Sequence, residues 1–272
     1  MTTLPRQAEP SRRVVLQGVG FDLVSGSDVV LHVLREIASG RGGRIITPNV
    51  DIVRQASRSP EAREHIDDST LVVADGAPLI WASRVARQPL PGRVAGSDLI
   101  WTLAEALATQ QRSVYLLGGE PGAANGAAER LATMYPGLRL AGYDSPSLGF
   151  DQRPEEYDEV CDRVRIAAPD MVFVGLGFPK QERVISRLSP TMPSTWFMGC
   201  GAAIGFVAGT RRRAPRWMQR SGLEWLHRLG SEPRRLARRY LVHDLPFAAR
   251  LLASSALTRL RNGSHAGRVE DR

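Results

Sequence analysis

The sequence contains few cysteines, histidines and lysines. Two cysteines, Cys161 and Cys200, stand far apart, with no second thiol or histidine at metal-ligand spacing. The five histidines form no HExxH pattern. Lys180 is the single lysine, so arginine supplies nearly all of the 36 basic residues. We therefore expect reduced thiols, no zinc site and a cytoplasmic address.

Long apolar runs are also missing. No segment approaches eighteen uninterrupted apolar residues, which is close to the length that a membrane-spanning helix needs. The first residues, MTTLPRQAEPSRRVV, carry charge but no apolar run of signal-peptide length. Export and membrane spanning are therefore not expected.

The charge balance is strongly basic. Among 272 residues the formal net charge is +8, with 43% hydrophobic and 24% charged residues. This composition is typical of a globular protein with one large core and an appendage, or with two modest domains. The charge predicts a polyanionic partner, which could be nucleic acid, anionic lipid or a phosphorylated substrate.

Apolar runs rich in Val, Ile and Leu alternate with segments of helical period. The runs are RVVLQGV, RIITPNV, TLVVADG, SVYLLGG, LRLAGYD, DMVFVGLG and TWFMGCG. Continuous apolar strands are covered on both faces, so we predict an α/β fold with a mainly parallel, Rossmann-like sheet and helices on either side. The predicted organisation is a disordered N-terminus (1–11), an α/β catalytic domain (12–209), an Arg-rich helical appendage (210–252) and a disordered tail (253–272).

Polar residues follow several of these strands, where ligands of such sheets bind. Thr47 and Asn49 end the second run, and Asn49 is suited either to cap the next helix or to contact a ligand. Asp75 and Gly76 form either a routine turn or a cleft edge with a carboxylate for general-base chemistry.

Three later loops carry further candidates. Arg93 precedes a helix, where it is either a solvated loop arginine or a planar cation that binds an anion together with free backbone N–H groups. Gly118 and Gly119 follow a strand without GxGxxG spacing, so the backbone there suits a diphosphate better than a dinucleotide. Gln181 and Glu182 open a helix at the mouth of the expected cleft, where Gln181 could read a nucleobase or sugar, or only begin a polar turn.

From residue 211 to residue 250 the chain holds eleven arginines and three acids. A helix starting at Pro233 would place arginines on one arc and apolar residues on the other. A solvated face, a covered face or a lipid-binding face would each fit this pattern. We predict membrane or diphosphate contact by Arg211, Arg212, Arg213, Arg216, Arg220, Arg234, Arg235, Arg238 and Arg239.

The order of these segments resembles the WecG/TagA/CpsF glycosyltransferase family, which makes bacterial cell-surface polysaccharides. The resemblance covers nearly all of residues 12–250. It runs through TPNVDIV, ADG, LPGRVAGSDL, YLLGG, PDMVFVGLGFPKQE, GCGAAIGFVAGTRRRAPRWMQRSGLEWLHRL and EPRRLARRYL. It implies an inverting transfer of a hexose, commonly N-acetylmannosamine or a relative, from a UDP-sugar to a polyprenyl-diphosphate-linked saccharide.

The resemblance also implies roles for individual residues. The aspartate of the DG motif, here Asp75, would be the base, and the site would be lined by Thr47, Asn49, Arg93 and Gln181. Ala74 stands where many relatives have proline. GCGAAIGF replaces the more usual GVGGSFDF, so Ala203 and Gly205 have lost polar or bulkier groups.

The expected chemistry follows from these residues. No Asp-x-Asp pair is present to hold a divalent ion, so we expect a metal-independent enzyme with no cofactor beyond its UDP-sugar donor. The expected address is the inner face of the plasma membrane, reached by peripheral contact with anionic lipid. The sequence is compatible with a homo-oligomer but does not determine the oligomeric state.

Three other classes of protein are weighed against this one. A nucleotide-sugar oxidoreductase or epimerase would use the same kind of sheet, but it would need a dinucleotide fingerprint and a Tyr-x-x-x-Lys pair, and Lys180 is the single lysine. A nucleic-acid-binding protein fits the charge, but no recognition motif is present, so nucleic acid is not an expected partner. The chain could also be an inactive scaffold in polysaccharide assembly, and only an activity assay would distinguish such a scaffold from the enzyme.

Overall fold

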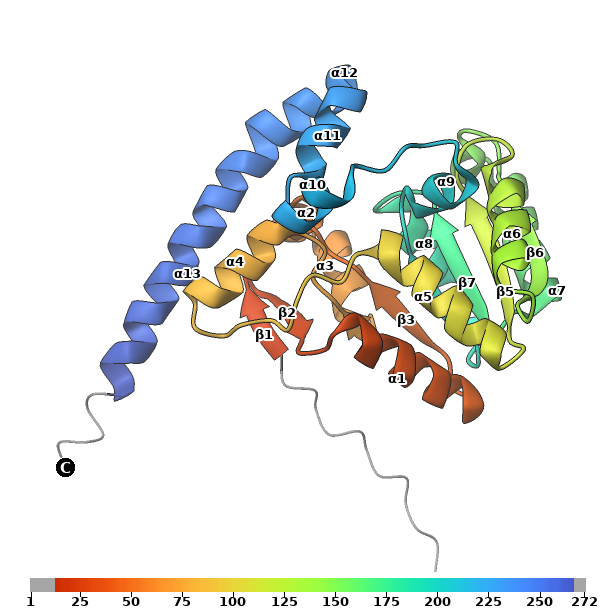
Figure 1. The fold of residues 1–272 in the computed structure, drawn as a ribbon, viewed down its shortest axis with the longest axis horizontal. Helices are drawn as coiled ribbons and strands as arrows, with labels where there is room; N and C mark the ends of the chain where they lie inside the picture. Colours follow the sequence, from red (N-terminus) through yellow and green to blue (C-terminus); the bar gives the residue numbers. More distant parts are fainter. Residues whose placement is uncertain (1–12, 267–272) are drawn as a thin grey trace, which may run out of the picture.

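The computed structural model describes residues 13–266 and has an α/β architecture (Figure 1). Its main sheet has six strands in the order β4-β3-β8-β7-β5-β6, and every neighbouring pair is parallel. The strands are β3 (Gly43–Ile46), β4 (Leu71–Val72), β5 (Ser113–Gly118), β6 (Arg139–Asp144), β7 (Met171–Gly175) and β8 (Trp196–Gly199). The predicted fold class is confirmed.

Helices cover both faces of this sheet (Figure 1). One face packs against α1 (Gly26–Ala38), α5 (Gly96–Thr109), α6 (Ala123–Met134) and α9 (Ala203–Ala208). The other packs against α2 (Val50–Ala56), α3 (Pro60–Asp67), α4 (Ala77–Val85), α7 (Pro154–Ala167) and α8 (Lys180–Leu188). Along β5, Val114 and Leu116 point to the first layer and Tyr115 and Leu117 to the second, which explains the unbroken apolar run.

A two-stranded antiparallel hairpin, β1 (Arg13–Leu16) and β2 (Val19–Asp22), protects one edge of the sheet. The Asp22 carboxylate accepts the backbone N–H of Val72 in β4 at 2.8 Å and pairs with Arg13 at 2.9 Å. The sequence analysis predicted β1 but not β2. A four-residue strand after a tight turn has too short a pattern to stand out.

The strand order opens a crevice near the middle of the sheet. β3 leads outward to β4, β5 leads outward to β6, and β7 and β8 fill the space between β3 and β5. Ligands of parallel sheets bind where the connections diverge in this way, beyond the carboxyl ends of the strands.

The C-terminal segment is helical but is not a separate unit. It contains α10 (Arg216–Ser221), α11 (Glu224–Ser231), α12 (Pro233–Ala237), the π-helix η3 (Arg238–Asp244) and α13 (Leu245–Ala266). Two 3₁₀ turns, η1 (Phe150–Gln152) and η2 (Ser189–Thr191), belong to the preceding α/β part of the chain. α13 runs along α4 (Figure 1) and buries Phe247 and Leu251 in the same apolar cluster as β1 and β2. The boundary at residue 210 therefore marks a change of composition rather than of core.

Two sequence expectations differ from the structure here. Helix α13 continues to Ala266, whereas a disordered tail was expected from residue 253; Ser255 is buried and Gln17 donates to Ser254 at 2.6 Å. The expected disordered residues 1–11, together with 12 and 267–272, lie outside the described residues.

The second difference concerns the basic arc after Pro233. The wider turn of the π-helix rotates the residues that follow Ala237, so Arg239 turns inward to Asp51 at 2.9 Å while Leu241 is 51% exposed. Arg239 and Leu241 therefore exchange the faces expected from a regular helix. None of the helices between residues 13 and 266 combines the length and hydropathy needed to span a bilayer.

Candidate active site

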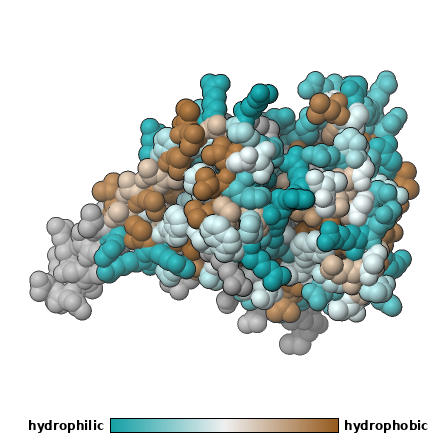
Figure 2. All heavy atoms as spheres, turned by 45° about the horizontal axis from the view of Figure 1, so that its top comes forward, coloured by the Kyte–Doolittle hydropathy of each residue, from teal (hydrophilic) through white to brown (hydrophobic). Residues whose placement is uncertain are grey.

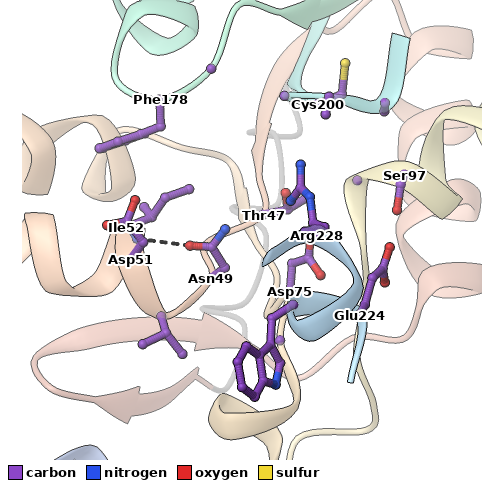
Figure 3. Close-up of a pocket in the computed structure, with 18 of the residues that line it drawn as sticks. Thr47, Asn49, Asp51, Ile52, Asp75, Ser97, Phe178, Cys200, Glu224 and Arg228 are labelled. Atoms are coloured by element: carbon purple, nitrogen blue, oxygen red, sulfur yellow. Dashed lines mark hydrogen bonds between the residues drawn. The ribbon is translucent and has the colours of Figure 1, made fainter. Parts of the chain in front are cut away.

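A cavity of about 660 Å³ lies at the carboxyl ends of β3, β8 and β7 and is closed on one side by the C-terminal helices. It brings together half of the site residues that the sequence analysis singled out, among them Thr47, Asn49 and Asp75 (Figure 3). Those lining it are Thr47, Asn49, Asp75, Gly76, Arg93, Gly119, Gln181, Arg211 and Arg239.

Asn49 has a structural role as well as a place in the wall. Its side-chain oxygen accepts the backbone N–H of Ile52 at 3.1 Å and caps α2 (Figure 3). The same cap orients the amide nitrogen of Asn49, and the bond leaves that nitrogen available to a ligand. Thr47 lies beside it and is almost fully buried.

Asp75 presents a carboxylate to the cavity. Its backbone N–H donates to Pro48 at 2.9 Å, and Gly76, with φ of 154°, allows the chain to turn directly into α4. No side chain or backbone group within residues 13–266 hydrogen-bonds to the carboxylate. Burial raises the pKa of Asp75 to about 6, against an opposing effect of the Arg93 guanidinium.

The side chain of Gln181 lines the cavity, but its amide group is hydrogen-bonded to the surrounding loops and does not project freely into the cavity. Its amide oxygen accepts the backbone N–H groups of Gly177 at 3.2 Å and Gly201 at 3.1 Å, and its amide nitrogen donates to Glu182 at 3.1 Å. These bonds join the loops that follow β7 and β8. Glu182 lies behind Gln181, is buried and does not line the cavity; burial raises the pKa of Glu182 to about 7.

The two glycines after β5 have different roles. Gly119 lines the cavity, whereas Gly118 does not. A Cβ on Gly118 would lie 2.6 Å from the Gly175 carbonyl oxygen, so this glycine permits the close approach of β5 and β7.

The arginines of the C-terminal segment divide into two groups. Arg211 pairs with Glu120 at 2.8 Å and with Glu232 at 3.0 Å in the cavity wall, and Arg239 also lines the cavity. The predicted contacts that do not line it are Arg212, Arg213, Arg216, Arg234 and Arg238. The side chains of Arg220 and Arg235 lie outside the described part of the chain.

Sequence reasoning missed three cavity residues of α11, namely Glu224, Trp225 and Arg228. Arg228 points toward the space between Thr47 and Asp75 (Figure 3). Among the cavity-lining arginines that the structure describes, Arg228 is the one without an ion pair. The available signal was the i, i+4 spacing of Glu224 and Arg228, which places both on one face of a helix.

The structure explains one departure of the segment GCGAAIGF from the more usual GVGGSFDF, namely the glycine at position 205. A Cβ on Gly205 would lie 3.2 Å from Cδ of Arg211, so the missing side chain makes room for this arginine. Cys200 lines the cavity, and burial raises the pKa of its thiol to about 12, which keeps it protonated and poorly nucleophilic. Among the described residues, no three His, Cys, Asp or Glu side chains are grouped so that they could hold a metal ion.

Comparison with known proteins places this geometry in a family. The model of the glycosyl transferase WecG/TagA/CpsF family matches residues 14–262. A Bacillus spizizenii protein named N-acetylglucosaminyldiphosphoundecaprenol N-acetyl-beta-D-mannosaminyltransferase is 31% identical over 198 residues, 73% of this chain and 75% of the relative. A Staphylococcus aureus (strain MW2) protein of the same name is 29% identical over 228 residues, 83% of this chain and 87% of the relative. With a match over nearly its whole length and a carboxylate-bearing cavity at the carboxyl ends of the central strands, the chain belongs to the WecG/TagA/CpsF family of glycosyltransferases.

Proposed function

We propose that this enzyme transfers a hexose of the N-acetylmannosamine type from a UDP-sugar to a polyprenyl-diphosphate-linked saccharide, with inversion and without a metal ion. The observation that carries the proposal is that one cavity holds two complementary groups: among the described residues, the Asp75 carboxylate has no hydrogen-bond partner and the Arg228 guanidinium has no counter-ion. The names of the relatives supply the class of acceptor and of sugar.

Asp75 is suited to act as the general base. Its carboxylate would take the proton of the acceptor hydroxyl while that oxygen forms a bond to the anomeric carbon, and the bond from this carbon to the UDP oxygen breaks. A pKa of about 6 leaves Asp75 ionised at neutral pH and still basic enough to accept a proton. A single displacement of this kind inverts the anomeric configuration.

Arg228 is suited to the leaving group. Negative charge develops on the departing diphosphate, and a preorganised cation in a cavity wall stabilises it without reorganisation. The other cavity-lining arginines in the described part of the chain are paired with carboxylates, Arg93 with Glu224, Arg211 with Glu120 and Arg239 with Asp51. They would add N–H donors in fixed positions beside the uncompensated charge of Arg228.

Exposed apolar residues adjoin the cavity and suit a lipid-linked acceptor. Leu245 both lines the cavity and is 45% exposed, and it continues the exposed residues Leu241 and Val242. Figure 2 shows apolar side chains gathered with charged ones along the side formed by the C-terminal helices. Together with Trp217 this surface supports peripheral docking on an anionic membrane, where the acceptor resides.

The test is a transfer assay with purified enzyme. UDP-sugars are first screened by the shift in melting temperature, and those that bind are then offered with a synthetic polyprenyl-diphosphate sugar. We expect transfer with one N-acetylhexosamine donor, a product of inverted anomeric configuration by ¹H NMR, and unchanged rates in EDTA.

Three results would contradict the proposal. Complete loss of transfer in EDTA, restored by a divalent ion, would contradict a metal-independent mechanism. Retention of the anomeric configuration would contradict a single displacement. Steep, salt-dependent binding of DNA or RNA without any sugar transfer would favour a nucleic-acid-binding protein instead.

A further inference from the structure

Four charged side chains form a closed ring beside Asp75. Arg93 Nη1 donates to Glu224 Oε2 at 2.9 Å, and Arg213 Nε donates to Glu224 Oε1 at 3.3 Å. Arg213 Nη1 donates to Asp98 Oδ1 at 2.5 Å, and Asp98 Oδ2 lies 3.7 Å from Arg93 Nη2. Two cations and two anions therefore alternate around the ring.

The ring joins parts of the chain that are far apart in sequence. Arg93 lies in the loop between α4 and α5, and Asp98 lies in the first turn of α5. Arg213 belongs to the segment after α9, and Glu224 is the first residue of α11. Glu224 contacts both arginines and is only 16% exposed at its side chain, so it is the member that ties the C-terminal helices to the core.

Arg93 depends on this ring for its placement. An arginine in a loop has many rotamers of similar energy, and ordering them costs entropy. A charge-assisted bond to a largely buried carboxylate selects one of them. The Glu224 bond therefore fixes the guanidinium in the cavity wall, where both residues line the space next to Asp75.

We propose that Glu224 is a positioning residue, which holds Arg93 in the cavity wall and sets the charge balance around Asp75. The part of this inference that concerns turnover rests on the proposed function; the part that concerns the charge balance does not. No role for Glu224 followed from its sequence position, because its partners are distant in the chain.

The charges that face Asp75 support this role. They come from the loop before α5 (Arg93), from α5 (Asp98) and from α11 (Glu224 and Arg228). The arginines favour the ionised carboxylate of Asp75, whereas Glu224 and Asp98 oppose it. Glutamine at position 224 keeps an amide oxygen that can accept from Arg93, so Glu224→Gln removes the repulsion while Arg93 stays in place, and the pKa of Asp75 should fall.

The first experiment measures this pKa directly and needs no substrate. Aspartate ¹³C-carboxyl signals are titrated by NMR in the full chain, with Asp75 assigned by its loss in Asp75→Asn. In Glu224→Gln we expect the pKa of Asp75 to fall by roughly half a unit to one unit. The matched control is Asp158→Asn on α7, which breaks the exposed pair with Arg187 at 3.2 Å and should leave Asp75 unchanged.

A second variant covers the case in which Glu224→Gln does not fold. Asp98 is half exposed, so Asp98→Asn is expected to fold, and it removes the other ring carboxylate that faces Asp75. We expect a smaller shift in the same direction. An unchanged Asp75 pKa in the folded variants would overturn the proposal, and so would a rise.

The second experiment asks whether positioning matters for turnover. In Glu224→Ala, which removes the acceptor that holds Arg93, we expect kcat to fall about 10- to 100-fold with a donor KM changed less than about threefold, because Arg93 acts mainly as charge develops on the leaving group. A lower melting temperature with unchanged kcat would reduce Glu224 to a structural tie and overturn the proposal. If the wild-type chain transfers no sugar, the proposed function fails while the NMR titration still decides the role of Glu224.

Discussion

Asp75 is placed at a cost to the fold. Its carboxylate lies in the wall of the cavity without a hydrogen-bond donor among residues 13–266, and burial raises its pKa from 3.8 to about 6. A carboxylate that is stabilised by donors would be a weaker base. The environment of Asp75 therefore favours reactivity over stability.

The pH dependence of transfer should report this pKa. We expect kcat/KM to be constant above about pH 7 and to fall about tenfold per pH unit below pH 6, because only the ionised Asp75 accepts a proton. Initial rates between pH 5 and pH 9 test this. If Glu182→Gln abolished the acid limb, the limb would belong to Glu182, whose pKa burial raises to about 7, and the assignment would be wrong.

Replacement of Asp75 should separate activity from stability. We expect Asp75→Asn to lose about 10²-fold or more in kcat. A carboxyl group whose pKa is higher in the folded chain destabilises the fold progressively from about pH 4 to pH 6, and fully above pH 6. The shift of about two units corresponds to a free-energy penalty on the order of 2 to 3 kcal/mol. The variant should therefore melt several degrees higher than wild type at pH 7.5, with a smaller difference at pH 5; a variant less stable at both values would contradict this.

The hydrogen bonds of Gln181 should stabilise the loops that form the floor of the cavity. Gln181→Ala leaves the N–H groups of Gly177 and Gly201 and the Glu182 carboxyl without their partner, which should cost roughly 1 to 3 kcal/mol of unfolding free energy. Urea denaturation measures this. Gln152→Ala, at an exposed position of η1, is the matched control and should change the free energy of unfolding by less than about 0.5 kcal/mol.

Single residues also show what the sequence can predict. Asn49 was recognised as a possible cap because capping is local, and the structure confirms the cap. Lys180, the single lysine, pairs with Asp151 at 2.7 Å and lies 5.7 Å from the Phe150 ring centre, so it anchors η1 to α8. Neither this pair nor the position of Arg228 beside Asp75 is encoded in neighbouring residues, and both required the tertiary fold.

At the scale of elements, prediction succeeded where burial made the pattern strong. Buried strands such as β5 and β7 are continuous apolar runs, which have few other interpretations. Prediction was less successful after Pro233. The first residue of α12 was predicted correctly, but the π-helix that follows α12 was not predicted. Tertiary contacts select such a turn, since residues of η3 pack against α2 and pair with Asp51.

Helix α13 should be required for the stability of the core. Leu251 is fully buried against α4 and the hairpin, whereas Leu257 on the same helix is 61% exposed. Leu251→Ala should lower the free energy of unfolding by about 2 to 5 kcal/mol, and Leu257→Ala should have little effect. Equal effects of the two substitutions would show that α13 does not dock as described.

At the scale of the molecule, the arginine-rich C-terminal segment is only partly a surface feature. Arg211, Arg213 and Arg239 are paired with carboxylates around the cavity, whereas Arg216 and Arg238 are exposed. Arg216 and Arg238, rather than the paired arginines, are therefore the ones that an anionic membrane would meet.

Membrane binding should depend on the exposed arginines. We expect flotation with anionic vesicles at low salt and weaker flotation at high salt, because the attraction is screened. Removing Arg216 or Arg238 should weaken binding about fivefold each, from about 1 kcal/mol per arginine near the surface. Arg187→Ala on α8 is the control and should bind as wild type does. Salt-insensitive binding, or none to anionic vesicles, would argue against this docking.

The contact between the hairpin and α13 also bears on how the chain reaches its native state. Val14 and Leu16, near the start of the described chain, share one apolar cluster with Phe247 and Leu251, near its end. This cluster therefore closes only through contacts between segments far apart in the sequence, whose loop-closure entropy must be overcome first, so we expect it to form late in folding.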